Sequence, residues 1–137
     1  MFEKWKQKRE EKKAKDRAIA ESGYWKNHPG MRRCLQAMRG SCTVAPMELH
    51  EAVIAVVNIA LAENTWTESD RIPADFLSGT VFMVWNDEKL PVLKAPWELV
   101  TENLDDVRAV ADRSFLVSKT MDRIMYLENN KIWLYAI

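Results

Sequence analysis

Residues 123–137, with the sequence RIMYLENNKIWLYAI, decide the fold of this chain. Two runs that are rich in apolar and aromatic residues flank Asn129-Asn130, and asparagine tolerates the positive φ angles that a two-residue hairpin loop requires. The stretch therefore predicts an antiparallel hairpin of strands 123–128 and 131–137. A register centred on this loop pairs Glu128 with Lys131, Leu127 with Ile132, Tyr126 with Trp133, Met125 with Leu134 and Ile124 with Tyr135.

Both faces of this hairpin are apolar, because side chains alternate across a strand. The two sets are Met125, Leu127, Ile132 and Leu134 on one face, and Ile124, Tyr126, Trp133 and Tyr135 on the other. We favour burial of the aromatic set under the N-terminal helices, since exposed aromatic patches are uncommon on monomeric proteins. An exposed aromatic face would instead be an interaction surface, with Tyr126, Trp133 and Tyr135 as its partner-binding residues.

A second hairpin is expected over residues 80–95. Thr80–Trp85 is rich in β-branched and aromatic residues and predicts a strand, residues 86–89 form the turn, and residues 90–95 return. Pro91 cannot donate a hydrogen bond to a sheet, so the returning strand is expected to be an edge strand.

The segments around this hairpin carry weaker patterns. Apolar spacing predicts a helix over residues 97–112, with Asn103 capping its second half, and a strand over residues 114–119 follows. Residues 65–79 have the composition of a loop, in which residues 74–77 are expected to form one turn of helix.

Three helices are expected before the hairpins. The first helix covers residues 2–22 and is stopped by Gly23. The second covers residues 31–38 and is stopped by Gly40, and Pro46 begins the third and strongest helix. The expected core stripe of the third helix comprises Leu49, Val53, Val56, Val57, Ala60 and Leu61.

The order of these elements predicts an α+β fold, with N-terminal helices followed by a mostly antiparallel sheet. Runs of helices and hairpins without regular βαβ alternation are typical of this class. The length of 137 residues fits one ordinary domain. We divide the chain into a basic helical arm, residues 1–22, and a single α+β domain, residues 23–137.

The charges are segregated along the chain, although the net charge is zero. Residues 1–40 hold 12 Lys/Arg and 5 Asp/Glu, a net of +7, so the remaining 97 residues hold 8 and 15, a net of −7. Such asymmetry indicates either an arm that seeks an anionic surface or one that docks on its own acidic body. The sequence leaves both alternatives open.

The arm itself has little to bury. Between Lys6 and Arg17 the only apolar side chain is Ala14, so this helix is expected to be solvated or to lie against a partner. Its expected anchors are Phe2, Trp5, Ala18 and Ile19, and its candidate partner-binding residues are Lys8, Arg9, Lys12 and Lys13. Residues 4–39 could also neutralise nucleic-acid phosphates, although acidic residues are interleaved with the basic ones.

Sequence signatures of catalysis are missing. The chain has no P-loop, no G-x-G-x-x-G and no G-x-S-x-G. The acidic pairs Asp87-Glu88 and Asp105-Asp106 are expected to be structural or surface features. We therefore predict no catalytic residue and no cofactor.

The histidines and cysteines form a loose set: His28, Cys34, Cys42 and His50. The gaps between them are five, seven and seven residues, whereas zinc sites usually pair ligands at two to four, so no metal site is predicted. We expect Cys34 to be a buried structural residue and His50 to lie on a helix surface. An enzyme site assembled in space around these four residues ranks third among the functional hypotheses.

The leading hypothesis is a non-enzymatic protein-binding module, such as a neutralising (immunity-like) or chaperone-like partner of another protein. The alternative is a nucleic-acid-associated accessory protein that acts through the basic arm. Two thiols make no disulfide framework, the N-terminus has no apolar leader, and the most apolar run, residues 52–62, is about half the ~20 residues that span a bilayer. We therefore expect a cytoplasmic protein without a membrane span.

Overall fold

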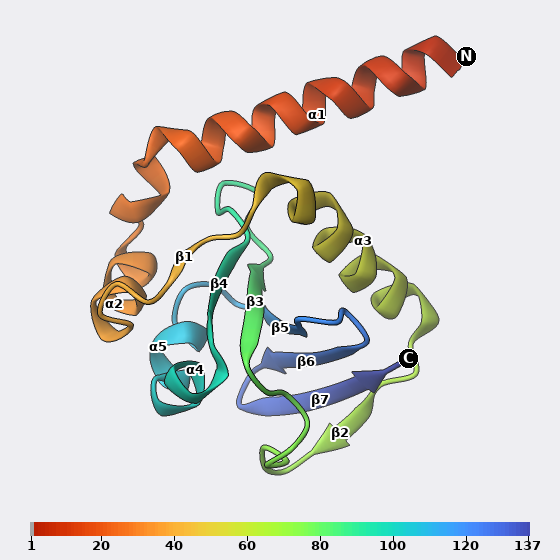
Figure 1. Cartoon of the computed structure of the whole chain (residues 1–137). Helices are drawn as coiled ribbons and strands as arrows, with labels where there is room; N and C mark the ends of the chain where they lie inside the picture. Colours follow the sequence, from red (N-terminus) through yellow and green to blue (C-terminus); the bar gives the residue numbers. More distant parts are fainter. Residues whose placement is uncertain (1) are drawn as a thin grey trace.

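Seven strands form one antiparallel sheet within the part of the chain that the structure describes (Figure 1). This computed structural model describes residues 2–137, apart from the side chains of Phe2 and Trp5. The strands are β1 Thr43–Val44, β2 Thr67–Ser69, β3 Thr80–Trp85, β4 Leu93–Pro96, β5 Ser114–Ser118, β6 Arg123–Glu128 and β7 Lys131–Ala136. Their order in the sheet is β1-β4-β3-β5-β6-β7-β2, which confirms the predicted α+β class.

The helices are α1 Phe2–Ser22, η1 Tyr24–Asn27, α2 Pro29–Ala37, α3 Met47–Glu63, α4 Trp97–Glu102 and α5 Leu104–Arg108. They cover the sheet on both faces. One core lies between the sheet and α2, α4 and α5, and includes Met31, Met83 and Leu116. The other core lies between the sheet and α3, and includes Val53, Phe82 and Val117.

The C-terminal hairpin has the predicted register at every pair. Asn129 and Asn130 have φ angles of 50° and 65°, the left-handed conformation that the two-residue loop requires. Helix α3 covers the aromatic face, where Tyr135 is buried and Tyr126 and Trp133 are half-buried. Burial of this face under an N-terminal helix, the favoured interpretation, therefore matches the structure.

The prediction that the strand after Pro91 lies at a sheet edge was wrong. Strand β4 begins at Leu93, so Pro91 precedes the strand and its missing N–H does not affect the pairing of the sheet. Strand β1 covers the outer side of β4 through the pairs Val44↔Leu93 and Thr43↔Lys94. The Ala45 N–H continues this pairing by donating to the Val92 carbonyl at 2.9 Å.

Two other segments also differ from the prediction. The expected helix 97–112 is two short helices, because the backbone of Asn103 is not helical, with a φ angle of −121°. The Asn103 side-chain amide donates back to the Leu99 carbonyl at 2.9 Å and does not cap α5. The expected loop 65–79 contains β2, which pairs with β7. Residues 74–77 form a turn and not a helix.

Helix α1 crosses one side of the molecule, over α3 and one end of the sheet (Figure 1). It ends as predicted at Gly23, which has a φ angle of 74°. Near its C-terminal end, Ile19 and Ala20 are half-buried and the Trp25 indole donates to the Ala20 carbonyl at 3.1 Å. The expected anchor Ala18 is exposed, and the side chains of the expected anchors Phe2 and Trp5 lie outside the described residues.

The described helices include none with the length and apolarity to span a membrane.

Gly30 fixes the approach of α2 to the segment after α5. A Cβ atom at this position would lie 2.7 Å from the Ala109 carbonyl oxygen and 2.8 Å from the Val110 Cα. Both are backbone atoms, so Gly30→Ala is expected to lower the free energy of unfolding by about 1–3 kcal/mol, as overpacking does. Urea denaturation measures this change. The control is Gln36→Ala on the exposed face of α2, whose free energy of unfolding should stay within about 0.5 kcal/mol of that of the wild type. If Gly30 had open space around it, Gly30→Ala would stabilise the helix. A stabilising effect would therefore contradict the close packing.

Candidate functional site

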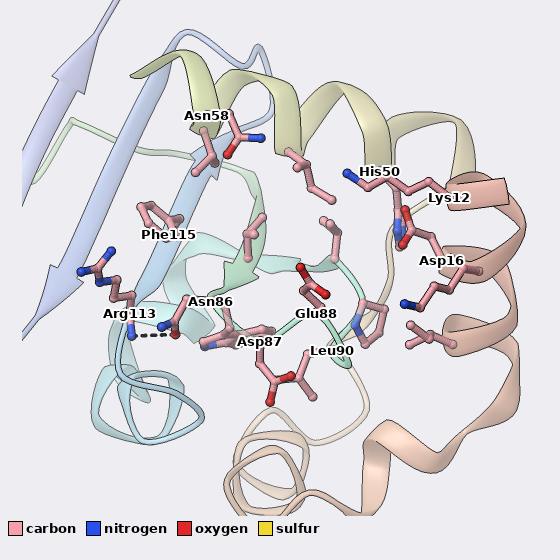
Figure 2. A pocket seen from close by; sticks show the side chains of 18 of the residues that line it. Lys12, Asp16, His50, Asn58, Asn86, Asp87, Glu88, Leu90, Arg113 and Phe115 are labelled. Atoms are coloured by element: carbon pink, nitrogen blue, oxygen red, sulfur yellow. Dashed lines mark hydrogen bonds between the residues drawn. The ribbon is translucent and has the colours of Figure 1, made fainter. Parts of the chain in front are cut away.

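A cavity of about 680 Å³ lies between α1, α3 and the connection from β3 to β4, and we call it the arm cavity (Figure 2). Its volume is in the range of ligand-binding sites, about 300–1,000 Å³. Its apolar lining comes from α3 and the sheet and includes Ile54, Val57, Val84, Val92 and Phe115. Its polar lining includes Lys8, Lys12, Lys15, Asp16, His50, Asp87 and Glu88.

Helix α1 reaches over this cavity with the support of one acidic residue of α3. Glu51 accepts Arg9 Nε at 2.8 Å and Lys13 Nζ at 3.3 Å, and both contacts are about half-exposed. Hydrogen bonding from Arg9, followed by that from Lys13, holds the pKa of Glu51 below its ordinary value. The basic arm thus docks in part on the chain's own acidic surface, one of the two alternatives that the charge pattern left open.

His50 is the polar residue at the bottom of this arrangement, and its predicted place on a helix surface was wrong. Its side chain is only 4% exposed. It shares the buried face of α3 with Val53, Val57 and Ala60, at spacings of three, seven and ten residues. Residues at this spacing lie on one side of a helix. The apolar pattern of α3 therefore indicates a buried position for His50, although its polar side chain suggested a surface position.

The His50 ring has one satisfied and one unsatisfied nitrogen. It makes a hydrogen bond with the Ala45 backbone, whereas Nε2 is buried and has no partner. Burial lowers the pKa of His50 below its ordinary value, against the opposing effects of the Ala45 bond and of Asp16. The ring is therefore neutral at pH 7, and Nε2 is an acceptor without a donor, an arrangement that costs about 1–3 kcal/mol in a folded protein.

The wall opposite α3 is a turn whose backbone is fixed. Lys89 N–H donates to Asp87 Oδ1 at 2.9 Å, and Arg113 N–H donates to Asn86 Oδ1 at 3.1 Å. Asp87 is thus a structural residue of the turn, as expected for this acidic pair. Its neighbour Glu88 is exposed, and Figure 2 shows its carboxylate pointing into the arm cavity.

The other members of the histidine and cysteine set have structural roles. His28 Nδ1 accepts the Met31 N–H at 3.3 Å and so caps α2. Cys34 and Cys42 are buried, as expected for Cys34. Burial, with a smaller effect of Asp106, raises the pKa of Cys34 to about 11, and burial with the neighbouring Cys34 raises the pKa of Cys42 to about 12.

Residues 2–137, as far as they are described, contain no group of three His, Cys, Asp or Glu residues that could hold a metal ion.

The predicted partner-binding residues divide between two regions. Lys8 and Lys12 line the arm cavity, and Arg9 and Lys13 pair with Glu51 at its side. The aromatic residues of the hairpin lie outside the cavity lining. The Tyr135 hydroxyl donates to Glu63 Oε2 at 2.5 Å, the Tyr126 hydroxyl donates to Glu128, and Trp133 packs on Tyr126 with ring centroids 5.1 Å apart.

The predicted partner-binding residues do not include His50, Glu88 and Phe115, which line this site. Phe115 connects the two regions, since it lines the arm cavity and its ring lies 4.7 Å from that of Tyr126. These residues come from three separate elements, so no local motif could have grouped them. His50 alone left a signal, through its helical phase.

Comparison with known proteins adds no further information on this site. No protein-family model matches the chain, and the search of curated proteins finds no match.

The two cysteines are expected to be unreactive in the native protein. Their raised pKa values keep them protonated at pH 8, so alkylation by iodoacetamide should be at least about a hundredfold slower than that of an ordinary exposed thiol. Ser41→Cys, at an exposed position beside Cys42, is the matched control and should react at an ordinary rate. Mass spectrometry measures the labelling, and rapid labelling of Cys42 in the native protein would contradict its burial.

His50→Phe should leave the stability at pH 7.5 unchanged or raise it by about 1 kcal/mol, because it removes a buried unsatisfied acceptor along with one hydrogen bond. The folded-state pKa of His50 is lowered, so the unfolded chain takes up the proton first as the pH falls below about 6.5. The wild type should therefore lose stability between pH 7.5 and 5.5 relative to His50→Phe.

Urea denaturation at several pH values measures this difference. The charged groups around the ring, Lys12, Asp16 and Glu88, are present in both proteins, so their own titration cancels. A parallel pH dependence of the two proteins would show that His50 is solvated in the folded state.

Proposed function

We propose that this chain is a non-enzymatic protein-binding module that holds a segment of its partner in the arm cavity. The observation that carries this proposal is the cavity itself, which has an apolar floor and the basic helix α1 over it. A neutralising, immunity-like role or a chaperone-like role would use this surface to bind the other protein. Two free thiols favour the cytoplasm as the compartment.

The exposed apolar residues of α3 support a protein partner. Ile59 and Leu61 are 55% and 38% exposed, and Leu61 lines the arm cavity. An apolar floor with charged residues at its rim is the usual anatomy of a protein interface. The lysines of α1 at this rim, Lys8, Lys12 and Lys15, favour a partner segment with flanking acidic residues.

The attachment of α1 also supports this use. The two ion pairs at Glu51 are exposed, and such pairs contribute little to stability and weaken with salt. Of the α1 side chains that the structure describes, the half-buried ones are Asp16, Ile19 and Ala20, all in the C-terminal third of the helix. A partner segment that displaces the stretch around Arg9 and Lys13 would break these exposed pairs at Glu51.

Binding of nucleic acid through residues 4–39 is the second candidate. It is favoured by the exposure of basic side chains along α1, including Lys4, Lys6, Lys15 and Arg17. It is disfavoured by the exposed acidic residues Glu3, Glu10 and Glu11 between them.

A pull-down from source-cell extract tests the proposal, with nuclease treatment and washes at low and high salt. The wild type should retain one stoichiometric protein, and the double variant Lys8→Glu, Lys12→Glu should retain at least about tenfold less, since it reverses two rim charges. Arg71→Glu with Lys119→Glu makes the same change of net charge at exposed positions outside the cavity and residues 4–39, and should behave as the wild type.

Two results would contradict this function. Retention of the same protein by the Lys8→Glu, Lys12→Glu variant would place the interface elsewhere. Loss of all bound material on nuclease treatment, with steep salt dependence, would favour the nucleic-acid candidate.

A further inference from the structure

The unsatisfied Nε2 of His50 requires a hydrogen-bond donor. His50 is only 4% exposed. It lines the arm cavity, and Figure 2 shows it on the cavity side of α3. Since Nε2 alone lacks a partner, Nδ1 makes the bond with Ala45, and the neutral ring then presents a lone pair at Nε2. A group that donates a hydrogen bond would satisfy this atom.

Two carboxylates lie around the same part of the cavity. Asp16 comes from α1 and Glu88 from the connection between β3 and β4, and Figure 2 shows both with His50 around one space. Asp16 lies near enough to affect the titration of His50. Ionised carboxylates only accept hydrogen bonds, so the three side chains offer acceptors from three elements to one occupant.

The cavity is also lined by cations, namely three lysines of the arm and Arg113, which directly precedes β5. Lys12 points toward the same space, but its ammonium makes no hydrogen bond with His50 Nε2. Lys8 and Lys15 line the α1 side with it. A basic group of a partner would therefore lie near these cations as well as the carboxylates, and acidic neighbours of that group would offset the repulsion.

The remaining lining is apolar. Ile54 and Val57 from α3 face Val84 and Phe115 from the sheet. Such a surface suits the aliphatic stem of a long basic side chain, which buries its methylene groups and keeps its charged end on acceptors. An anionic group beside His50 would instead meet two carboxylates and a lone pair, and only the lysines of α1 and Arg113 elsewhere in the lining would attract it.

From these observations we propose that the arm cavity receives a lysine or arginine side chain of the partner protein, whose charged end donates hydrogen bonds to His50 Nε2, Asp16 and Glu88. This inference rests on the proposed function and specifies the chemistry of the partner segment: one basic residue with acidic neighbours. A basic side chain supplies several donors to several acceptors and thereby satisfies the buried nitrogen.

Three probes of nearly equal shape test this chemistry: benzamidinium, which is cationic, benzamide, which is neutral, and benzoate, which is anionic. The readout is the ¹⁵N chemical shift of His50 Nε2 during titration of the full chain at pH 7.5. Benzamidinium should shift this resonance with a dissociation constant at least about tenfold lower than that of benzamide, and benzoate should not shift it. Equal affinities of the three probes, or no shift with any of them, would overturn the proposal and leave water as the occupant.

Variants separate the acceptors from the rest of the cavity. Glu88→Gln should weaken benzamidinium binding about threefold to tenfold, whereas Glu102→Gln, a matched change at an exposed position of α4, should not. His50→Phe should weaken it at least about tenfold by calorimetry, and its urea denaturation curve shows whether the chain is folded. Unchanged affinity in folded His50→Phe would contradict the role of Nε2.

Competition separates this inference from the proposed function. Benzamidinium at saturating concentration should release the captured partner from the pull-down, and benzamide should not. If the partner depends on Lys8 and Lys12 but benzamidinium neither binds nor releases it, the protein-binding function stands and the basic side chain is excluded. If benzamidinium binds at His50 but capture of the partner does not depend on Lys8 and Lys12, the arm cavity binds a cation and the proposed protein interface is contradicted.

Discussion

The burial of strand β5 on both faces is the constraint on which the rest of the structure depends. All five residues from Ser114 to Ser118 are buried, so neither face of the sheet centre can be left to solvent. The chain meets this requirement with α3 on one face and with α2, α4 and α5 on the other. Each cover is short relative to a seven-strand sheet, and the part that α3 leaves open, near the end of β3, becomes the floor of the arm cavity.

The parts of the fold that sequence could predict are those that local patterns specify. Alternation in residues 123–137 and the Asn129-Asn130 loop define a hairpin register, and the structure has it at each pair. The strands that the sequence missed depend on non-local backbone contacts. Strand β1 has only two residues and β2 only three, so neither carries a periodic pattern, and both exist through hydrogen bonds to β4 and β7.

The site was harder to predict than the fold for the same reason. Its lining comes from α1, α3, the turn after β3 and β5, which tertiary structure alone brings together. His50 shows what a pattern can still reveal, since it lies in the phase of Val53 and Val57 on the buried stripe of α3. A polar residue in an apolar stripe has either a structural partner or a functional reason, and here one nitrogen has a partner and the other has none.

The mixture of charges in the arm cavity bears on the choice between a protein and a nucleic-acid partner. The lysines of α1 would attract either partner, because cations steer any anionic surface. The acceptors discriminate: beside Lys8 and Lys12, a phosphate backbone would meet Asp16, Glu88 and the lone pair of His50. Specificity of this kind depends on repulsion of the wrong partner as much as on attraction of the right one. A protein segment can present both charges at a fixed spacing, whereas a uniform polyanion cannot, so the geometry favours the protein.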